Sequence, residues 1–93
     1  MKKNKKFIIM DFWAKWCNPC LYMKSIINEI EKKYEKKIYF KKINIDKKKK
    51  LCIKYNVQSI PTLIFFKKKK EKYRHIGIIS KENLNKKCKK LIS

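Results

Sequence analysis

The pattern of apolar and polar positions in the first third of the chain predicts a buried strand followed by a helix. Residues Phe7–Trp13 are mostly apolar with a single charge, Asp11, which is typical of a strand buried on both faces at the centre of a sheet. From Cys20 onward, apolar side chains recur at alternating steps of four and three residues, and polar side chains fill the other face. The recurring apolar positions are Met23, Ile27, Ile30 and Tyr34. This spacing predicts an amphipathic helix that starts in the segment around Cys20.

The middle of the chain predicts a second strand and a short second helix. Residues 38–45 are rich in β-branched and aromatic side chains, and the helix before them forms a crossover, so this strand should run parallel to the first. A short helix through Leu51 and Tyr55 follows, with Asp46 as its expected cap. This helix should end at Asn56, because asparagine tolerates the left-handed conformation that is common just past a helix C-terminus.

The last third of the chain predicts two strands joined by a charged turn, and then a final helix. Residues 62–66 form the third strand, residues 67–70 the turn, and residues 73–79 a fourth strand that contains the only glycine, Gly77. Ser80 is placed to cap the last helix. The apolar face of that helix would carry Leu84, Cys88, Leu91 and Ile92. The predicted order of elements is therefore βαβαββα.

Length and composition predict a single folded domain over residues 1–93. A chain of 93 residues can enclose one hydrophobic core but not two separate ones. Hydrophobic residues make up 44% of the chain, which is enough apolar surface to drive folding despite the high charge. The sequence contains neither an internal repeat nor a linker rich in Gly, Ser or Pro, so we expect one cooperative unit.

The charge of the chain opens a second interpretation, as a basic binding module. The formal net charge is +21, from 28 basic residues against 7 acidic ones. Clustered lysines bind nucleic acids or anionic membranes because they neutralise phosphates and release counterions. The alternative is that the lysines are solvated surface residues in a chain whose composition has drifted. We expect no specific nucleic-acid partner and no membrane partner, and the binding module stays open as an alternative.

The start of the chain is basic, as in an export signal, but the apolar segment behind it is short. Residues 1–6 carry four lysines, and the apolar residues 7–10 are followed at once by Asp11. An export signal would need an apolar segment of ~7–15 residues. No run in the sequence approaches the length of a membrane span either. We therefore expect a cytoplasmic protein, in a reducing compartment where a catalytic disulfide cycles and a structural one would not persist.

Two of the four cysteines form a close pair, Cys17 and Cys20, with Asn18 and Pro19 between them. At the start of a helix this spacing places both sulfur atoms at the same end of the first turn. The free N–H groups and the positive end of the helix dipole favour a thiolate there, so Cys17 should be the attacking nucleophile. Cys20, one turn further in and more shielded, would be the resolving thiol. Pro19 suits the first turn because it lacks an N–H and fixes φ near the helical value.

The same pair could instead be half of a zinc site completed by Cys52 and Cys88. The other half of a zinc ribbon would normally be a second close pair, whereas these two thiols are isolated in the sequence. Cys88 falls on the apolar face of the last predicted helix, and Cys52 follows Leu51. We expect both to pack as small hydrophobic residues, and we expect no metal site.

Residues 11–20, DFWAKWCNPC, resemble the active-site signature of the thioredoxin family. Three further segments support the resemblance: residues 42–46 look like the second core strand of that family, residues 57–62 like its cis-proline loop, and Ile76-Gly77 like its last substrate-groove element. The resemblance implies an α/β, thioredoxin-like fold with a βαβαββα core. Because ten residues precede Asp11, it implies a four-stranded mixed sheet flanked by helices, with residues 38–45 at an exposed edge.

The resemblance also implies roles for two charged residues, Asp11 and Lys42. Asp11 matches the buried carboxylate that moves a proton to or from the resolving thiol of Cys20, and Lys42 matches the charged neighbour of that carboxylate. A carboxylate in an apolar strand has a raised pKa unless it is paired, which suits a general acid or base. An alternative stays open for each residue: Asp11 could mark an exposed edge, and Lys42 could block edge-to-edge strand pairing.

A substrate groove is the next feature that the resemblance implies. Pro61 matches the proline that follows a cis peptide bond and packs against the cysteines, and the backbone of Ile60 would pair with an extended substrate strand. Asn18 stands where the family commonly has glycine, a position that tunes the redox potential. The expected substrate-binding residues are Trp16, Asn18, Pro19, Ile60, Pro61, Ile76 and Gly77.

The activity implied by the resemblance is that of a protein-disulfide reductase. Cys17 and Cys20 would exchange their dithiol with disulfides of client proteins, and NADPH would restore the dithiol through a thioredoxin reductase. The chain itself would bind no cofactor and would act as a monomer. A disulfide oxidase or isomerase of the same fold is the first alternative. The basic binding module with vestigial redox activity is the second.

Overall fold

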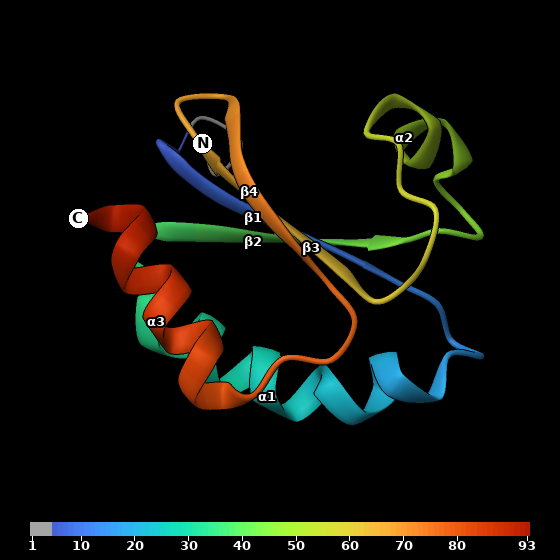
Figure 1. The fold of residues 1–93 in the computed structure, drawn as a ribbon, viewed down its shortest axis with the longest axis horizontal. Helices are drawn as coiled ribbons and strands as arrows, with labels where there is room; N and C mark the ends of the chain where they lie inside the picture. Colours follow the sequence, from blue (N-terminus) through green and yellow to red (C-terminus); the bar gives the residue numbers. More distant parts are fainter. Residues whose placement is uncertain (1–4) are drawn as a thin grey trace.

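The computed structural model describes residues 5–93, and Figure 1 shows the order of elements that the sequence predicts. The elements are β1 (Phe7–Trp13), α1 (Asn18–Tyr34), β2 (Ile38–Asn44), α2 (Lys49–Lys54), β3 (Thr62–Lys67), β4 (Lys70–Ile76) and α3 (Lys81–Ile92). Residues 1–4 of the basic start lie outside the described residues. Within the described part of the chain, none of the helices combines the length and apolar character that a membrane crossing requires.

The four strands form one mixed sheet in the order β2-β1-β3-β4. β1 pairs with β2 in parallel and with β3 in antiparallel orientation, and β3 pairs with β4 in antiparallel orientation. β1 is therefore a central strand, which explains its apolar sequence, and β2 is the exposed edge that the sequence predicts. In the β1–β2 register, Asp11 lies opposite Lys42. The α/β fold class and the four-stranded mixed sheet are confirmed.

The helices cover both faces of the sheet, α1 and α3 on one side and α2 on the other (Figure 1). Because side chains alternate along a strand, β1 supplies both cores. Ile9 packs into the cluster beneath α1 and α3, which also contains Met23 and Leu84. Phe12 packs into the smaller cluster beneath α2. Asp11 shares the face of Ile9 by this alternation, so its carboxylate points toward α1 rather than toward solvent.

The fourth strand lies three residues earlier than the sequence predicts. β4 spans Lys70–Ile76 instead of residues 73–79, because the turn before it needs only Lys68 and Lys69. Both lysines have positive φ angles, 51° and 67°, as two-residue hairpin turns of the I′ type require. The sequence lacks the Asn-Gly or Asp-Gly pair that usually signals this turn. At the other end Gly77, with φ 95°, follows the last residue of the strand.

The predicted helix ends are confirmed at two positions and wrong at one. The Ser80 hydroxyl accepts the Asn83 N–H at 3.1 Å and caps α3 as predicted, and Asn56 has a φ of 53° just past α2. Asp46 does not cap α2: the residue before the helix is Lys48, which makes no side-chain cap hydrogen bond. The carboxylate of Asp46 instead accepts a hydrogen bond from the indole N–H of Trp16.

Candidate active site

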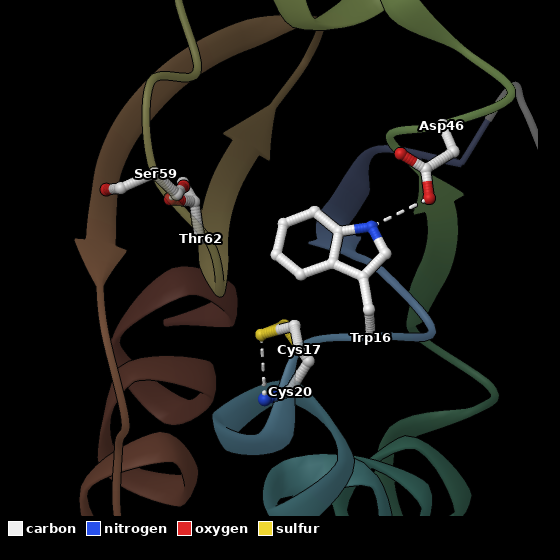
Figure 2. Close-up of a disulfide and its surroundings, with 6 residues drawn as sticks. All are labelled: Trp16, Cys17, Cys20, Asp46, Ser59 and Thr62. Carbon is white, nitrogen blue, oxygen red and sulfur yellow. Dashed lines mark hydrogen bonds between the residues drawn. A yellow bond between two sulfur atoms is a disulfide. The ribbon is translucent and has the colours of Figure 1, made fainter.

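Cys17 is the N-cap residue of α1, and it forms a disulfide with Cys20 in the first turn (Figure 2). The two Cα atoms are 5.2 Å apart. Cys17 has an extended backbone, and its Sγ accepts the backbone N–H of Cys20 at 3.2 Å. The helix begins at Asn18 because Pro19 in the first turn carries no N–H to leave unsatisfied. Asn18 and Pro19 are both exposed beside the disulfide.

This position stabilises negative charge on the Cys17 sulfur in the reduced protein. The first-turn N–H groups and the positive end of the helix dipole face Sγ, and the first turn of α1 contains no acidic residue to oppose them. The prediction that Cys20 is the more shielded thiol concerns the dithiol, whereas in the disulfide form the two residues are equally buried. Cys17 and Cys20 are 5% and 6% exposed, because the disulfide ties both sulfur atoms into the same turn.

Asp11 is buried next to Cys20, and both residues line a small cavity of about 90 Å³. Burial raises the pKa of the Asp11 carboxyl from its ordinary value near 3.8 to about 6. The positive charge of Lys42 acts in the opposite direction, and the negative charge of Glu31 adds to the rise. The alternative that Asp11 marks an exposed edge is therefore wrong, since β1 is central and Asp11 is only 7% exposed.

Lys42 lies beside this cavity but directs its ammonium group toward α1. Its Nζ forms an ion pair with Glu31 and donates a longer hydrogen bond of 3.4 Å to Asn28 Oδ1. Asn28 and Glu31 stand three residues apart on one face of the helix, so both can reach the edge strand. Sequence analysis misses Glu31, although the i, i+3 spacing of two polar residues on the predicted helix is a usable signal.

The Ile60–Pro61 peptide bond is cis, as the resemblance implies. Ile60 packs against the cluster that contains Cys17 and Cys20, so the loop lies directly beside the disulfide. Two hydrogen bonds hold the loop: Thr62 Oγ1 donates to the Ser59 carbonyl at 2.6 Å, and the Gly77 N–H donates to the Pro61 carbonyl at 2.8 Å. Figure 2 shows this segment facing the cysteines.

Trp16 is 66% exposed, and its indole Nε1 donates a 2.9 Å hydrogen bond to Asp46 Oδ2 (Figure 2). This bond replaces the helix-capping role predicted for Asp46, and no local pattern signals it because the two residues are 30 positions apart. Beside Trp16 lies an open groove of about 540 Å³, here called the Trp16 groove. Its lining includes Trp16, Asp46, Lys49, Ile53, Val57 and Ile60.

Ile76 and Gly77 lie outside the lining of the Trp16 groove. The Gly77 N–H donates a hydrogen bond to the Pro61 carbonyl, so Ile76 and Gly77 flank the cis-proline loop at the end of β4. Ile76 is 61% exposed there. The predicted substrate-binding residues thus fall in two places, with Trp16 and Ile60 at the groove and Ile76 and Gly77 on the segment hydrogen-bonded to the cis-proline loop. Pro61 itself is buried.

The remaining cysteines do not approach the Cys17–Cys20 pair. Cys88 is fully buried in the core beneath α1 and α3, and this burial raises the pKa of its thiol to about 12. Cys52 is half-buried in the core on the opposite face of the sheet. Within residues 5–93, no three Cys, His, Asp or Glu side chains gather in a way that would hold a metal ion. The zinc alternative would require these separated thiols to come together.

The geometry around Cys17 defines the class of protein. Two thiols in one helical turn can form a disulfide and return to the dithiol without moving the backbone far, and the exposed surface around them admits a second disulfide. The chain is a thiol–disulfide oxidoreductase that acts by dithiol–disulfide exchange through Cys17 and Cys20. Residues 1–90 match the family model described as Thioredoxin, and the chain belongs to the thioredoxin family.

Curated relatives and solved structures agree with this assignment. The chain is 42% identical over 82 residues to a thioredoxin of Buchnera aphidicola subsp. Baizongia pistaciae, covering 88% of this chain and 75% of that protein. It is 41% identical over 85 residues to the chloroplastic M-type thioredoxin of Pisum sativum, covering 91% of this chain and 49% of that protein. The crystal structure of the Drosophila melanogaster thioredoxin Deadhead superposes with a TM-score of 0.87 at 33% identity, over 95% of this chain and 83% of that one.

Proposed function

We propose that the chain carries electrons to client proteins as a protein-disulfide reductase, with Cys17 as nucleophile and Cys20 as resolving thiol. The observation that carries the proposal is the position of Cys17 at the N-cap of α1, beside the cis-proline loop. Cys17, Cys20 and Asp11 come from the same chain, so we assign the activity to a monomer with a single domain over residues 1–93.

In the first step, the Cys17 thiolate attacks one sulfur of the client disulfide. A mixed disulfide between Cys17 and the client forms, and the other client sulfur leaves as a thiolate. The client segment lies extended against the cis-proline loop, where the backbone of Ile60 offers main-chain hydrogen bonds. Trp16, Asn18, Pro19 and Ile76 offer exposed contact surface, Gly77 is half-buried, and Pro61 is buried and supports the loop from within.

In the second step, Asp11 accepts the proton of the Cys20 thiol, and the Cys20 thiolate attacks Cys17 Sγ. The Cys17–Cys20 disulfide forms, and the second client sulfur leaves as a thiolate, so that the client has gained two electrons. The cavity shared by Asp11 and Cys20 supports this proton transfer. A carboxyl with a pKa of about 6 is mainly ionised at neutral pH and can accept the proton. The positive charge of Lys42, on the edge strand β2, lowers the pKa of Asp11 and so limits the rise caused by burial.

The dithiol has to be restored after each cycle, and we assign that step to a thioredoxin reductase using NADPH. Members of the thioredoxin family work with a thioredoxin reductase and with disulfide-containing clients. The cysteine pair supplies the redox chemistry itself, so the chain needs no bound cofactor. A catalytic disulfide turns over in a reducing compartment, and we assign the chain to the cytoplasm on this ground. Because the pea relative is chloroplastic, cell fractionation with an antibody to the chain is the direct test.

The test of the proposed function is catalysis of disulfide reduction by the full chain. A peptide with one internal disulfide is incubated with dithiothreitol, and its reduction is followed with the wild type, Cys17→Ser and Cys20→Ser. We expect the wild type to accelerate the reaction, Cys17→Ser to be inactive, and Cys20→Ser to accumulate a mixed disulfide with the peptide. A wild-type rate equal to that of dithiothreitol alone would remove the reductase function and leave the binding module.

A further inference from the structure

We propose that the Trp16 groove selects clients in which the disulfide is flanked by an apolar side chain and then by acidic residues. The proposal rests on the proposed reductase function and names its substrate class. The groove has two parts that would recognise such a client. One is an apolar floor between Trp16 and α2, and the other is a rim of lysines on the segment that leads into α2.

The apolar part of the groove faces solvent. Ile53 on α2 is 80% exposed and Trp16 on the opposite side is 66% exposed, with Val57 and Ile60 between them. A large apolar side chain at this exposure costs free energy unless a partner covers it. Because the groove adjoins the disulfide through Ile60, an apolar residue of a docked client can reach it without leaving Cys17.

The rim of the groove is strongly basic. Residues 47–50 are all lysines, all are exposed, and the first turn of α2 contains no acidic residue. Lys49 and Ile53 stand four positions apart on one face of the helix, and both line the groove. Lys49 therefore places positive charge beside the apolar floor, and its neighbours Lys47, Lys48 and Lys50 add charge on the same segment.

Among the described carboxylates, Asp46 is the one beside these four lysines, so most of their positive charge has no counter-charge. Within residues 5–93 the three carboxylates that form ion pairs do so elsewhere, with Lys42, Lys81 and Arg74. Asp46 is the acidic residue at the groove, and its carboxylate is bonded to the Trp16 indole. A cluster of lysines with a net positive charge beside a shallow groove attracts acidic ligands and raises their rate of association.

The lining of the groove favours an acidic peptide over a nucleic acid as the occupant. Single-stranded nucleic acids bind on platforms of several aromatic rings, whereas Trp16 is the one aromatic side chain in the lining of this groove. An extended peptide can place one apolar side chain on Ile53 and its carboxylates on the lysine rim, which matches both parts of the site.

The experiment compares two disulfide peptides that share the cysteine loop and one leucine and differ only in flanking residues, glutamate in one and glutamine in the other. We measure kcat/KM for both at ionic strengths of about 0.01 M and about 1 M, between which the Debye length falls from ~30 Å to ~3 Å. We expect an approximately tenfold preference for the acidic peptide at low salt, lost at high salt. Equal kcat/KM values at low salt would overturn the inference but leave the reductase function intact. Reduction of neither peptide would overturn the reductase function itself.

A matched pair of variants tests whether the preference for the acidic peptide depends on the lysines beside the groove. The double variant Lys49→Glu/Lys50→Glu inverts the rim, and Lys86→Glu/Lys89→Glu makes the same change in net charge on exposed positions of α3, on the other face of the sheet. The rim variant should lose the preference for the acidic peptide, and the α3 variant should keep most of it. An equal loss in both variants would mean that net charge alone acts, which contradicts a built site. Stronger competition by a single-stranded RNA than by the reduced acidic peptide would assign the groove to nucleic acid instead.

Discussion

Lys42 lies opposite Asp11 in the parallel β1–β2 pair, yet its ammonium group is bonded to Glu31 of the neighbouring helix. The carboxylate beside the catalytic disulfide is therefore governed by three influences: its own burial, a lysine that lowers its pKa, and a glutamate that raises it. Burial is the largest of the three, so the pKa of Asp11 settles at about 6. The charge of Asp11 therefore changes close to neutral pH, and the negative charge of Glu31 raises the pH at which this happens.

Replacement of Asp11 by asparagine should stabilise the oxidised protein, and the effect should depend on pH. Folding raises the pKa of Asp11 from near 3.8 to about 6, so the folded state binds more protons than the unfolded state between these values. The contribution of Asp11 to the free energy of unfolding therefore falls as the pH rises through this window, by about 2–3 kcal/mol in total. In urea denaturation, the free energy of unfolding of Asp11→Asn relative to that of the wild type should rise by about this amount from pH 4 to pH 8. A stability difference that does not change with pH would contradict the raised pKa.

Replacement of Glu31 by glutamine should lower the pKa of Asp11. The substitution removes a negative charge that raises this pKa, and it releases Lys42 to interact with Asp11. Titration of the Asp11 carboxyl carbon by NMR measures the shift directly. Glu29→Gln is the matched control, because Glu29 lies on the same helix but pairs with Lys81. Identical Asp11 titration curves in the wild type and Glu31→Gln would show that Glu31 has no influence on the site.

Loss of the Asp46 carboxylate should free the Trp16 ring. The indole N–H has Asp46 as its acceptor, and an exposed hydrogen bond of this kind contributes about 0.5–1.5 kcal/mol. Asp46→Ala should lower the free energy of unfolding by up to that amount and shorten the time constant of Trp fluorescence anisotropy. Asp46→Asn keeps an acceptor oxygen and should behave like the wild type. If the alanine and asparagine variants had the same anisotropy decay, the hydrogen bond would not hold the ring.

The two cysteines outside the motif should differ sharply in reactivity. Cys88 is fully buried, and its thiol pKa of about 12, against an ordinary value near 9.0, lowers its thiolate fraction about a thousandfold. Cys52 is half-buried and accessible from the Trp16 groove. Iodoacetamide at pH 8, followed by mass spectrometry of the oxidised protein, should label Cys52 and leave Cys88 unmodified, whereas both should react in urea. Equal labelling of the native protein would contradict the burial of Cys88.

Much of the fold and the centre of the site can be predicted from the sequence. The apolar run of β1, the three- and four-residue spacing of α1 and the cap at Ser80 are local signals, and local signals determine element type. The Cys17–Cys20 pair is also local, because its spacing alone places both thiols in one turn. The cis bond before Pro61 follows from the family resemblance alone, since the Ile-Pro dipeptide itself favours trans.

The features that sequence analysis misses depend on contacts between distant residues. The Trp16–Asp46 and Lys42–Glu31 pairs join positions 30 and 11 residues apart, and only the packed sheet and helices bring them together. The position of Asp46 before a helix predicts a cap, yet the indole N–H is its partner in the fold. The hairpin at Lys68 and Lys69 escapes prediction because lysine is an unusual residue for two successive positive φ angles.

The central claim, that the Cys17–Cys20 pair is a reductant, is tested most directly by its equilibrium potential. The oxidised protein is equilibrated in graded thiol/disulfide buffers, and Trp fluorescence reports the fraction reduced, with Cys17→Ser as the control that shows no transition. The account predicts a potential near ~−270 mV, as is typical of thioredoxins, despite the asparagine at position 18. A potential between about −120 and −180 mV would contradict it and assign the chain to disulfide formation or isomerisation.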